Sequence, residues 1–233
     1  MTDRTAERRE EDWSPLEPDV HERQIEALGA FVRANSVRTA VDLGSGDGRV
    51  GVPMAALGVR VLAIDNDDEA LRRCAAAGLT TRNADLLDPA LDCTLDGEPP
   101  DCAWCLGNTL MEIPDGADAA AMLRRLRAAL RPGACLIIDN FSARYWPCVA
   151  QGLWVSGVSP DGTEQIVWAD DDNVFALRRG DEVDVDHEEI RPGDRLIRLW
   201  TRNELRLLAM ATGWEGPEED ESGELLILRR PEA

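Results

Sequence analysis

A glycine-rich segment placed directly after a short β-prone run constrains this chain more than any other feature. The run 37–43 (VRTAVDL) ends immediately before residues 44–48 (GSGDG). Glycines permit a tight turn there and let the backbone approach a bound molecule closely. A helix that follows offers free backbone N–H groups at its first turn. This strand–loop–helix order is typical of α/β folds that bind a ligand beyond the end of a strand.

Strand and helix patterns alternate from residue 37 to residue 141. The run 134–139 (ACLIID) is apolar almost throughout, as expected of a central parallel strand that is covered on both faces. The alternation predicts a parallel sheet with helices on both faces. We expect a first helix from about Asp19 to Asn35, strands at 37–43, 59–65, 79–84, 101–106 and 134–139, and helices at 49–57, 67–77 and 116–130.

Residues 142–200 break this rhythm. They contain four β-prone runs separated by glycine turns, which predicts an antiparallel unit inserted after the fifth strand. A helix over 202–211 and two runs near 213–214 and 224–229 then return to the main sheet, with the acidic tract 215–224 as an exposed hairpin tip. The four β-prone runs of the insertion are 165–169, 173–178, 182–190 and 195–200.

The charge balance excludes several chemistries. The chain has 25 basic residues, all of them Arg, and 45 acidic residues, for a net charge of −20. Without Lys there is no Schiff base, and the negative field repels nucleic acid and anionic lipid. No apolar run reaches the length of a membrane span, and the charged start has no signal-peptide pattern. We therefore expect a cytoplasmic protein with reduced thiols, no membrane partner and no nucleic-acid partner.

The acids around the glycine segment distinguish two cofactor classes. Residues 46–51 formally match a dinucleotide fingerprint, but the frame Asp-x-Gly-x-Gly-x-Gly from Asp42 starts at the strand end. Asp42 and Asp47 would repel a pyrophosphate. S-adenosylmethionine has no phosphate and carries a sulfonium and an ammonium group, so these acids suit it.

With this motif the sequence resembles the class I S-adenosylmethionine-dependent methyltransferases. Asp65 stands where the family has the acid that binds both ribose hydroxyls, and Asp85 stands where an acid binds the adenine amino group. Alternatively, either acid caps a helix. The resemblance implies a Rossmann-like, seven-stranded, mostly parallel sheet, and S-adenosylmethionine as cofactor. It implies cofactor contacts from Asp42, Gly44, Ser45, Gly46, Asp47, Gly48, Asp65, Asn66, Asp85, Leu86, Leu106 and Gly107.

The expected acceptor side begins after the fourth strand. The segment 105–110 (CLGNTL) lacks the (Asp/Asn)-Pro-Pro-aromatic signature of many methylases of nucleobases and glutamine amides. It is similar to the Gly-Asn-Ser/Thr segment of glycine N-methyltransferase-like enzymes. The segment 138–141 (IDNF) is similar to another feature of these enzymes, a strand that ends in Ile-Asp and is followed by polar and aromatic residues. Our candidate catalytic residues are Asn108, Asp139 and Tyr145, and our candidate acceptor-binding residues are Trp13, Glu112, Asn140, Trp146 and Trp200. The alternatives are core packing for Trp146 and Trp200 and a solvated helix position for Glu112.

Two other sequence features, a Cys-x-x-Cys spacing and a histidine, do not indicate a metal site or a general base. Cys102 and Cys105 are three apart on a strand, so their side chains face opposite ways, and no second Cys pair or nearby His completes a metal site. His187 is more consistent with a solvated strand residue than with a general base. We expect no metal.

The sequence therefore predicts a methyltransferase for a small-molecule acceptor, most simply an amine in natural-product biosynthesis. O-methylation of a small molecule or short peptide is the alternative reaction, and a non-catalytic S-adenosylmethionine-binding protein is the alternative of another class. The sequence leaves open which acceptor atom is methylated and whether the protein forms a homodimer. We divide the chain into a lid or flexible segment (1–18), a cofactor-binding core (19–141), an acceptor-side insertion (142–200) and a C-terminal part completing the sheet (201–233).

Overall fold

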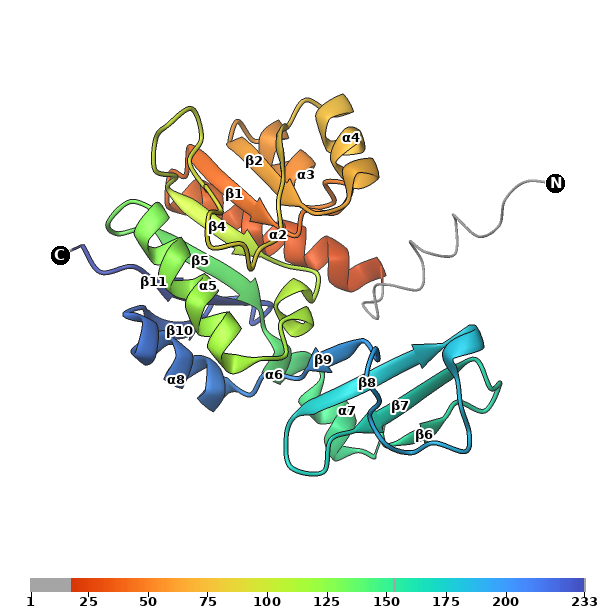
Figure 1. The fold of residues 1–233 in the computed structure, drawn as a ribbon. Helices are drawn as coiled ribbons and strands as arrows, with labels where there is room; N and C mark the ends of the chain where they lie inside the picture. The colour runs from red at the N-terminus through yellow and green to blue at the C-terminus, as the bar shows by residue number, and fades with distance from the viewer. Residues whose placement is uncertain (1–17, 153, 233) are drawn as a thin grey trace.

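The computed structural model of this chain describes residues 18–152 and 154–232. The expectations for residues 1–17, including acceptor binding by Trp13, lie outside the described residues. The described strands form two separate sheets, one of seven strands and one of four (Figure 1).

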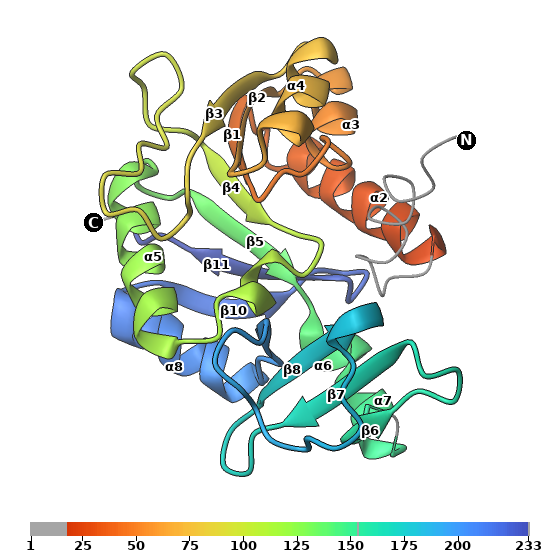
Figure 2. The same cartoon turned by 45° about the vertical axis from the view of Figure 1, so that its right-hand side comes forward.

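The larger sheet has the predicted α/β character. Its order is β10-β11-β5-β4-β1-β2-β3, and β11 runs antiparallel to both of its neighbours while the other pairings are parallel (Figure 2). Because β1 lies between β2 and β4, the chain reverses direction across the sheet there, and this switch point opens a crevice at the carboxyl ends of the strands. The strands are β1 (Thr39–Leu43), β2 (Arg60–Asp65), β3 (Thr80–Asn83), β4 (Cys102–Cys105), β5 (Cys135–Asp139), β10 (Glu215–Glu219) and β11 (Leu225–Arg229).

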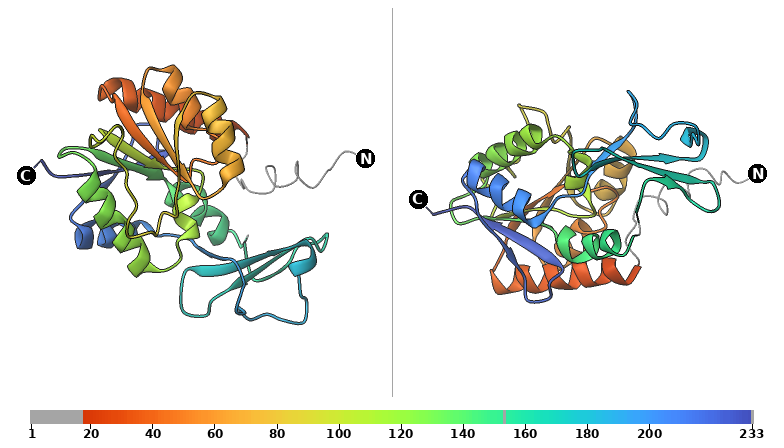
Figure 3. Two further views of the ribbon diagram at one scale, coloured as in Figure 1. Left: turned by 45° about the horizontal axis from the view of Figure 1, so that its top comes forward. Right: turned by 90° about the horizontal axis from the view of Figure 1, so that it is seen from below.

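Helices cover both faces of this sheet, as the alternating pattern predicts. Side chains alternate across each strand, so Val41 and Leu43 join one core while Ala40 joins the other. The first core includes residues of α5 (Gly116–Ala129) and α8 (Arg202–Thr212), and the second includes residues of α2 (Pro18–Ala34), α3 (Gly51–Ala56) and α4 (Asp68–Ala76). The right-hand view of Figure 3 shows α2 and α5 on opposite sides of the sheet. The remaining helical turns are η1 (Thr109–Glu112), α6 (Phe141–Arg144), α7 (Trp146–Ala150) and η2 (Gly180–Glu182).

The smaller sheet confirms the predicted antiparallel insertion after β5. It contains β6 (Gly157–Val158), β7 (Glu164–Trp168), β8 (Val174–Arg179) and β9 (Leu196–Arg198), all antiparallel. Its attachment to the core runs through η1, because the Trp200 indole N–H donates to the Leu110 carbonyl at 3.0 Å. Arg198 Nε donates to the Pro114 carbonyl at 2.5 Å and strengthens this attachment.

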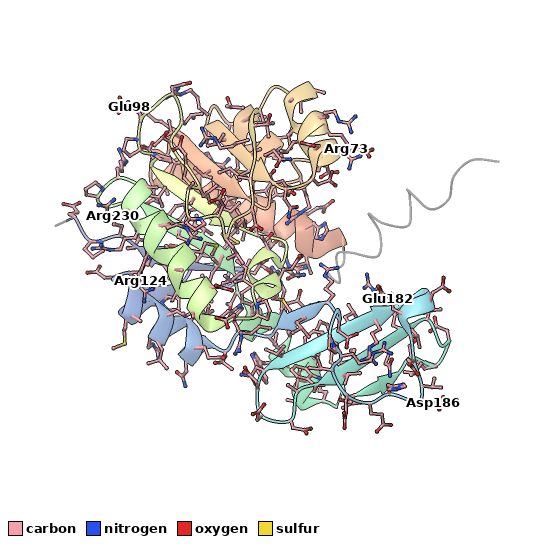
Figure 4. The ribbon with its side chains drawn as sticks, viewed as in Figure 1. Arg73, Glu98, Arg124, Glu182, Asp186 and Arg230 are labelled. Atoms are coloured by element: carbon pink, nitrogen blue, oxygen red, sulfur yellow. The ribbon has the colours of Figure 1, made fainter. Side chains whose placement is uncertain are left out.

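The strand expected over 182–190 is wrong, because residues 183–190 form an irregular loop. Two side chains of the small sheet provide the hydrogen bonds that a neighbouring strand would otherwise supply. Gln165 Nε2 donates to the carbonyl of Asp184 at 2.8 Å, and Arg178 donates to that of His187 at 2.9 Å. The loop thus satisfies its backbone without a ladder. Figure 4 shows its residue Asp186 on the outer surface of the insertion.

The acidic tract 215–224 also differs from the expectation of a hairpin tip. Its first half is the strand β10, and only the part after Glu219 forms the turn. Glu218 and Glu219 are exposed while Pro217 is buried, so the acids line the outer edge of the sheet. Charged side chains on an edge strand discourage pairing with another chain. Among the described residues, no helix combines the length and the apolar character required to cross a membrane.

Candidate active site

Three glycines of the loop after β1 adopt the left-handed backbone conformation. Gly44, Gly46 and Gly48 have φ angles of 66°, 52° and 91°. A Cβ at Gly44 would lie 2.4 Å from Thr109 Cγ2, so glycine there lets η1 pack on the loop. A Cβ at Gly46 would meet nothing within 4 Å, which leaves room for a ligand above the loop.

The Asp65 carboxylate lies against this loop. The backbone N–H of Gly46 donates to Oδ2 at 2.8 Å, and that of Asp67 donates to Oδ1 at 3.0 Å. A carboxylate has about four lone-pair sites, so Asp65 can still accept from two more donors. A diol is one ligand group that provides such a pair.

Asp42 lies beneath the loop and is buried. Burial raises the pKa of its carboxyl to about 7, and the nearby Arg49 guanidinium opposes that rise. A Cβ at Gly51 would come within 2.9 Å of Asp42 Oδ2, so α3 can begin close to β1 only because residue 51 is glycine. Asp42 and the buried Ser45 therefore support the loop from inside the protein.

A second carboxylate, Asp139, organises the loop after β4. It is fully buried at the end of β5 and accepts the backbone N–H groups of Gly107 at 3.3 Å and Asn108 at 3.0 Å. The side chains of Gln24 and Arg144 donate to it at 2.5 and 3.2 Å. Four donors thus fix this carboxylate, which ties α2 and α6 to the β4 loop.

The Arg49 guanidinium lies near Gln24 and the loop after β4, and one of its N–H donors has no hydrogen-bond partner among the described residues. Its Nη2 donates to Gln24 Oε1 at 3.3 Å and would lie 3.0 Å from a Cβ at Gly107. Within residues 18–152 and 154–232, its buried Nη1 has no hydrogen-bond partner. Leaving a buried donor unpaired is unfavourable, so an anionic group that reached Nη1 would be stabilised there.

Asn108 is held in a strained conformation at the mouth of the site. Its φ angle is 71°, and the Tyr145 hydroxyl donates to its Oδ1 at 2.6 Å. Burial raises the pKa of Tyr145 well above its usual range, which keeps that hydroxyl protonated. The Asn108 Nδ2 is buried and has no hydrogen-bond partner in the part of the chain that the structure describes.

A cavity of 350 Å³ lies between η1 and the small sheet. Apolar side chains line its middle, and two ion pairs stand at its rim: Glu112 with Arg195 at 3.1 Å and Glu164 with Arg179 at 3.0 Å. Burial raises the pKa of Glu112, while Arg195 lowers it. The lining residues are Asn108, Met111, Glu112, Trp154, Glu164, Ile166, Phe175, Leu177, Arg179, Arg195 and Ile197.

Two further features do not belong to this site. A hollow of 480 Å³ lies in the outer loop of the insertion, lined by residues 181–184 and 191–195, and none of the predicted site residues lines it. Across the described ranges, no group of three or more His, Cys, Asp or Glu side chains is arranged to hold a metal ion. His187 is exposed, and its Nδ1 lies 2.8 Å from Asp184 Oδ2.

The glycine loop lies within a segment that matches a known protein family. Residues 40–133, from β1 to the turn before β5, match the model of the methyltransferase domain family. Residues 40–133 thus form a methyltransferase domain, and the chain has the fold of the class I S-adenosylmethionine-dependent methyltransferases. Its cofactor is S-adenosylmethionine, as the acids of the glycine loop predict. A search of curated protein sequences gave no match.

Solved structures of methyltransferases share this fold. CcbJ from Streptomyces caelestis is 21% identical, with a TM-score of 0.62 over 93% of this chain and 91% of its own. CalS10 from Micromonospora echinaspora, an amino pentose methyltransferase, is 16% identical, with a TM-score of 0.58 over 91% of each chain. The sugar N-methyltransferase KedS8 from Streptoalloteichus is 17% identical, with a TM-score of 0.57 over 89% of this chain and 86% of its own.

The methyltransferase gathers most of the predicted cofactor residues at one edge of its sheet. The β1 loop, Asp65 and Asn66 at the end of β2, and the segment 106–108 after β4 lie there together, because the carboxyl ends of parallel strands meet. Ala84 after β3 donates its N–H to the Asp65 carbonyl at 2.9 Å and so places the next segment alongside. In that segment Asp85 is exposed and accepts the Leu87 N–H at 2.8 Å, while the Leu86 carbonyl accepts Arg125 at 3.0 Å.

Three residues predicted to contact the acceptor lie outside the cavity lining. Asn140 is buried, and its side chain caps α6 and donates to the Gly223 carbonyl at 2.8 Å. Trp200 is 2% exposed and belongs to the core, as its alternative interpretation states. Trp146 packs against that core and donates to the Trp200 carbonyl at 3.4 Å. None of the three lines the cavity, because the connection between the sheets requires them for packing.

Sequence reasoning missed several residues of the methyltransferase site. Gln24 left a readable signal, because it lies four residues from both Val20 and Leu28 on the apolar face of α2. A polar residue in a buried stripe indicates a specific hydrogen-bond partner. Arg49 and Trp154 gave no comparable signal, since one follows the glycine motif and the other lies in an irregular segment.

Proposed function

We propose that this methyltransferase methylates an amine nitrogen of a small molecule. The observation that carries the proposal is the 350 Å³ cavity, which reaches Asn108 next to the glycine loop. Its size is at the lower end of small-ligand sites and suits a molecule of one or two rings better than a polymer.

The residues of the loop fit S-adenosylmethionine. When bound, it supplies a methyl group whose bond to sulfur breaks, with the electron pair staying on sulfur, as the acceptor lone pair forms the new bond. Asp65 can accept the two ribose hydroxyls, and the buried Nη1 of Arg49 can take the carboxylate. The open space above Gly46 leaves the loop accessible.

The chain itself supplies orientation, a dry cavity and a route for a proton. The apolar wall formed by Ile166, Leu177 and Ile197 excludes water from the acceptor. Glu112, whose side chain is 44% exposed beside the cavity, can accept an N–H of the amine and pass the released proton to solvent. Asp139, with four donors on it, positions the Asn108 loop and does not serve as the base.

The similar structures favour nitrogen over oxygen. CalS10 acts on an amino pentose in calicheamicin biosynthesis, and KedS8 is a sugar N-methyltransferase. For this chain, CalS10 supports an acceptor from natural-product biosynthesis, and KedS8 supports a nitrogen acceptor.

A methyl-transfer assay tests the proposal. The purified protein is incubated with S-adenosylmethionine and matched amines, alcohols and short peptides, and S-adenosylhomocysteine and methylated product are followed by mass spectrometry. We expect N-methylated product from small amines. Product from alcohols alone would support the O-methyltransferase alternative. Tight cofactor binding without turnover of any acceptor would support a non-catalytic binding protein.

A further inference from the structure

The amide of Asn108 combines three properties that point to a ligand contact. It belongs to a residue that lines the acceptor cavity, it is 7% exposed, and its NH₂ group has no hydrogen-bond partner in residues 18–152 and 154–232. A buried donor without a partner costs about 1–3 kcal/mol, and a bound molecule that supplies an acceptor atom removes that cost.

The orientation of this amide is set by Tyr145. The separation of 2.6 Å between the Tyr145 hydroxyl and Asn108 Oδ1 is typical of an O–H···O bond and short for an N–H···O bond. Oδ1 therefore faces Tyr145, and the NH₂ group is the part of the amide that has no partner among the described residues, in a residue that lines the cavity. Trp154 packs on the Tyr145 ring, with the ring centroids 5.1 Å apart, and helps to hold it.

The backbone of Asn108 is equally constrained. Asp139 accepts its N–H at 3.0 Å, and the next residue, Thr109, packs directly over Gly44 of the glycine loop. The amide is thus fixed beside the place where the methyl donor binds. The part of an acceptor that supplies a lone pair to this NH₂ group would lie close to the methylated atom.

That part is not the reacting nitrogen itself. A neutral amine has one lone pair, and this lone pair must face the methyl group for the displacement to occur. A protonated amine has no lone pair to accept a hydrogen bond at all. The NH₂ donor of Asn108 therefore requires a second atom with a lone pair, and an oxygen next to the amine satisfies it.

Resting on the proposed function, we propose that Asn108 selects acceptors with an oxygen on the carbon adjacent to the amine-bearing carbon, that is, vicinal amino alcohols. Tyr145 is the positioning residue that turns the amide so that it donates. The wall beside Asn108 suits the carbon frame of such a molecule, because the strand register places Phe175 opposite Ile197 and Leu177 opposite Ile166 on the cavity face.

Matched probes test this selection. We would compare trans-2-aminocyclohexanol, cyclohexylamine and cyclohexanol as acceptors with the full chain and S-adenosylmethionine, and determine kcat/KM from methylated product. We expect at least a tenfold preference for the amino alcohol over cyclohexylamine, because an enzyme site that hydrogen-bonds a hydroxyl discriminates against the analogue without it. An amino alcohol that gives no more product than cyclohexylamine overturns the inference.

Two variants assign the preference to this amide. Asn108→Ala and Tyr145→Phe are each expected to reduce the ratio of the two kcat/KM values to within about threefold of one. A purely structural role would lower both values together and leave the ratio unchanged, which would overturn the assignment. Thermal melting and cofactor affinity verify that each variant is folded. If Asn108→Ala does not fold, the kcat/KM ratio of Tyr145→Phe tests the assignment by itself.

The same experiment separates the two proposals. Equal N-methylation of the amino alcohol and cyclohexylamine would overturn the selection by Asn108 and leave amine methylation standing. O-methylation of cyclohexanol and of the amino alcohol, without N-methylated product, would overturn the amine acceptor itself.

Discussion

At the scale of single residues, two acids that flank the glycine loop, Asp65 and Asp42, have opposite surroundings. Asp65 is half-buried, accepts two backbone N–H groups and keeps lone pairs toward open space. Asp42 is 2% exposed, and its Oδ2 has no hydrogen-bond partner among the described residues. We therefore expect substitutions at the two positions to have different effects.

Asp65→Ala is expected to weaken S-adenosylmethionine binding at least tenfold. The substitution removes the carboxylate that would accept the ribose hydroxyls and also frees the Gly46 N–H, and hydrogen bonds to charged groups contribute about 1.5–3 kcal/mol each. Calorimetric titration measures the affinity. Asp96→Ala, at an exposed position outside the site, is the control. Equal affinity of the two variants would contradict the role of Asp65.

Asp42→Asn is expected to change how the stability of the ligand-free protein depends on pH. The folded-state pKa of about 7 lies above the usual value of 3.8, so the folded state holds this proton more tightly than the unfolded state. The stabilisation from that proton is complete below about pH 4 and is lost as the pH rises to about 7. The asparagine variant lacks this loss.

Urea unfolding at pH 5 and at pH 8 measures the effect of Asp42→Asn. We expect the free energy of unfolding of the variant, relative to the natural protein, to be higher at pH 8 than at pH 5 by on the order of 2 kcal/mol. Asp96→Asn makes the same charge change at an exposed position and should show no such trend. A pH-independent difference for Asp42→Asn would contradict the raised pKa.

At the scale of elements, strand β8 alternates between two tasks. Arg178 is 1% exposed and points away from the cavity, where its guanidinium pairs with Asp194 at 2.7 Å and donates to the carbonyls of His187 and Glu189. The next residue, Arg179, lines the cavity on the other face. Adjacent arginines on one strand therefore serve the loop and the acceptor separately.

Arg178→Met and Arg179→Met are expected to differ accordingly. Removing one partner of a buried ion pair costs about 3 kcal/mol or more, so Arg178→Met should lower the melting temperature and speed amide hydrogen exchange in residues 183–190. Arg179→Met should leave both nearly unchanged and raise the acceptor KM. Similar stabilities of the two variants would contradict this division.

At the scale of the whole molecule, the two sheets build two sides of one site. The large sheet provides the glycine loop and Asp65, and the small sheet provides the opposite wall of the cavity. The segment 106–112 belongs to both sides, because it runs from the end of β4 through η1, which contacts β9.

Substitutions in the small sheet are therefore expected to affect the acceptor and not the cofactor. Leu177→Ala removes part of the cavity wall from a half-buried position, so we expect the acceptor KM to rise about tenfold. Cofactor affinity should stay within about twofold. Steady-state kinetics and calorimetry measure the two quantities, and a tenfold loss of cofactor affinity would contradict the separation.

The predictability of the fold depends on where each element finds its hydrogen bonds. The five strands predicted between residues 37 and 139 begin and end within two residues of their expected positions, and the apolar runs among them reflect burial between two helix layers. The run 182–190 looks like a strand but pairs with the side chains of Gln165 and Arg178. The composition of residues 182–190 could not show this pairing, since Gln165 and Arg178 lie outside that segment of the sequence.

The sequence by itself determined the α/β core, the inserted sheet and the cofactor. The spacing of the glycines and acids can be read from short segments of the sequence. These segments form one site because the carboxyl ends of parallel strands meet at the same edge of the sheet. Only the tertiary structure decided the acceptor side, because the cavity joins Asn108, Trp154 and Arg195 from three separate segments. It also packs Asn140 and Trp200 away from the cavity, and among the described residues it leaves a donor on Asn108 without a partner. Burial and pairing of this kind depend on neighbours brought together by folding, which no single segment of the chain records.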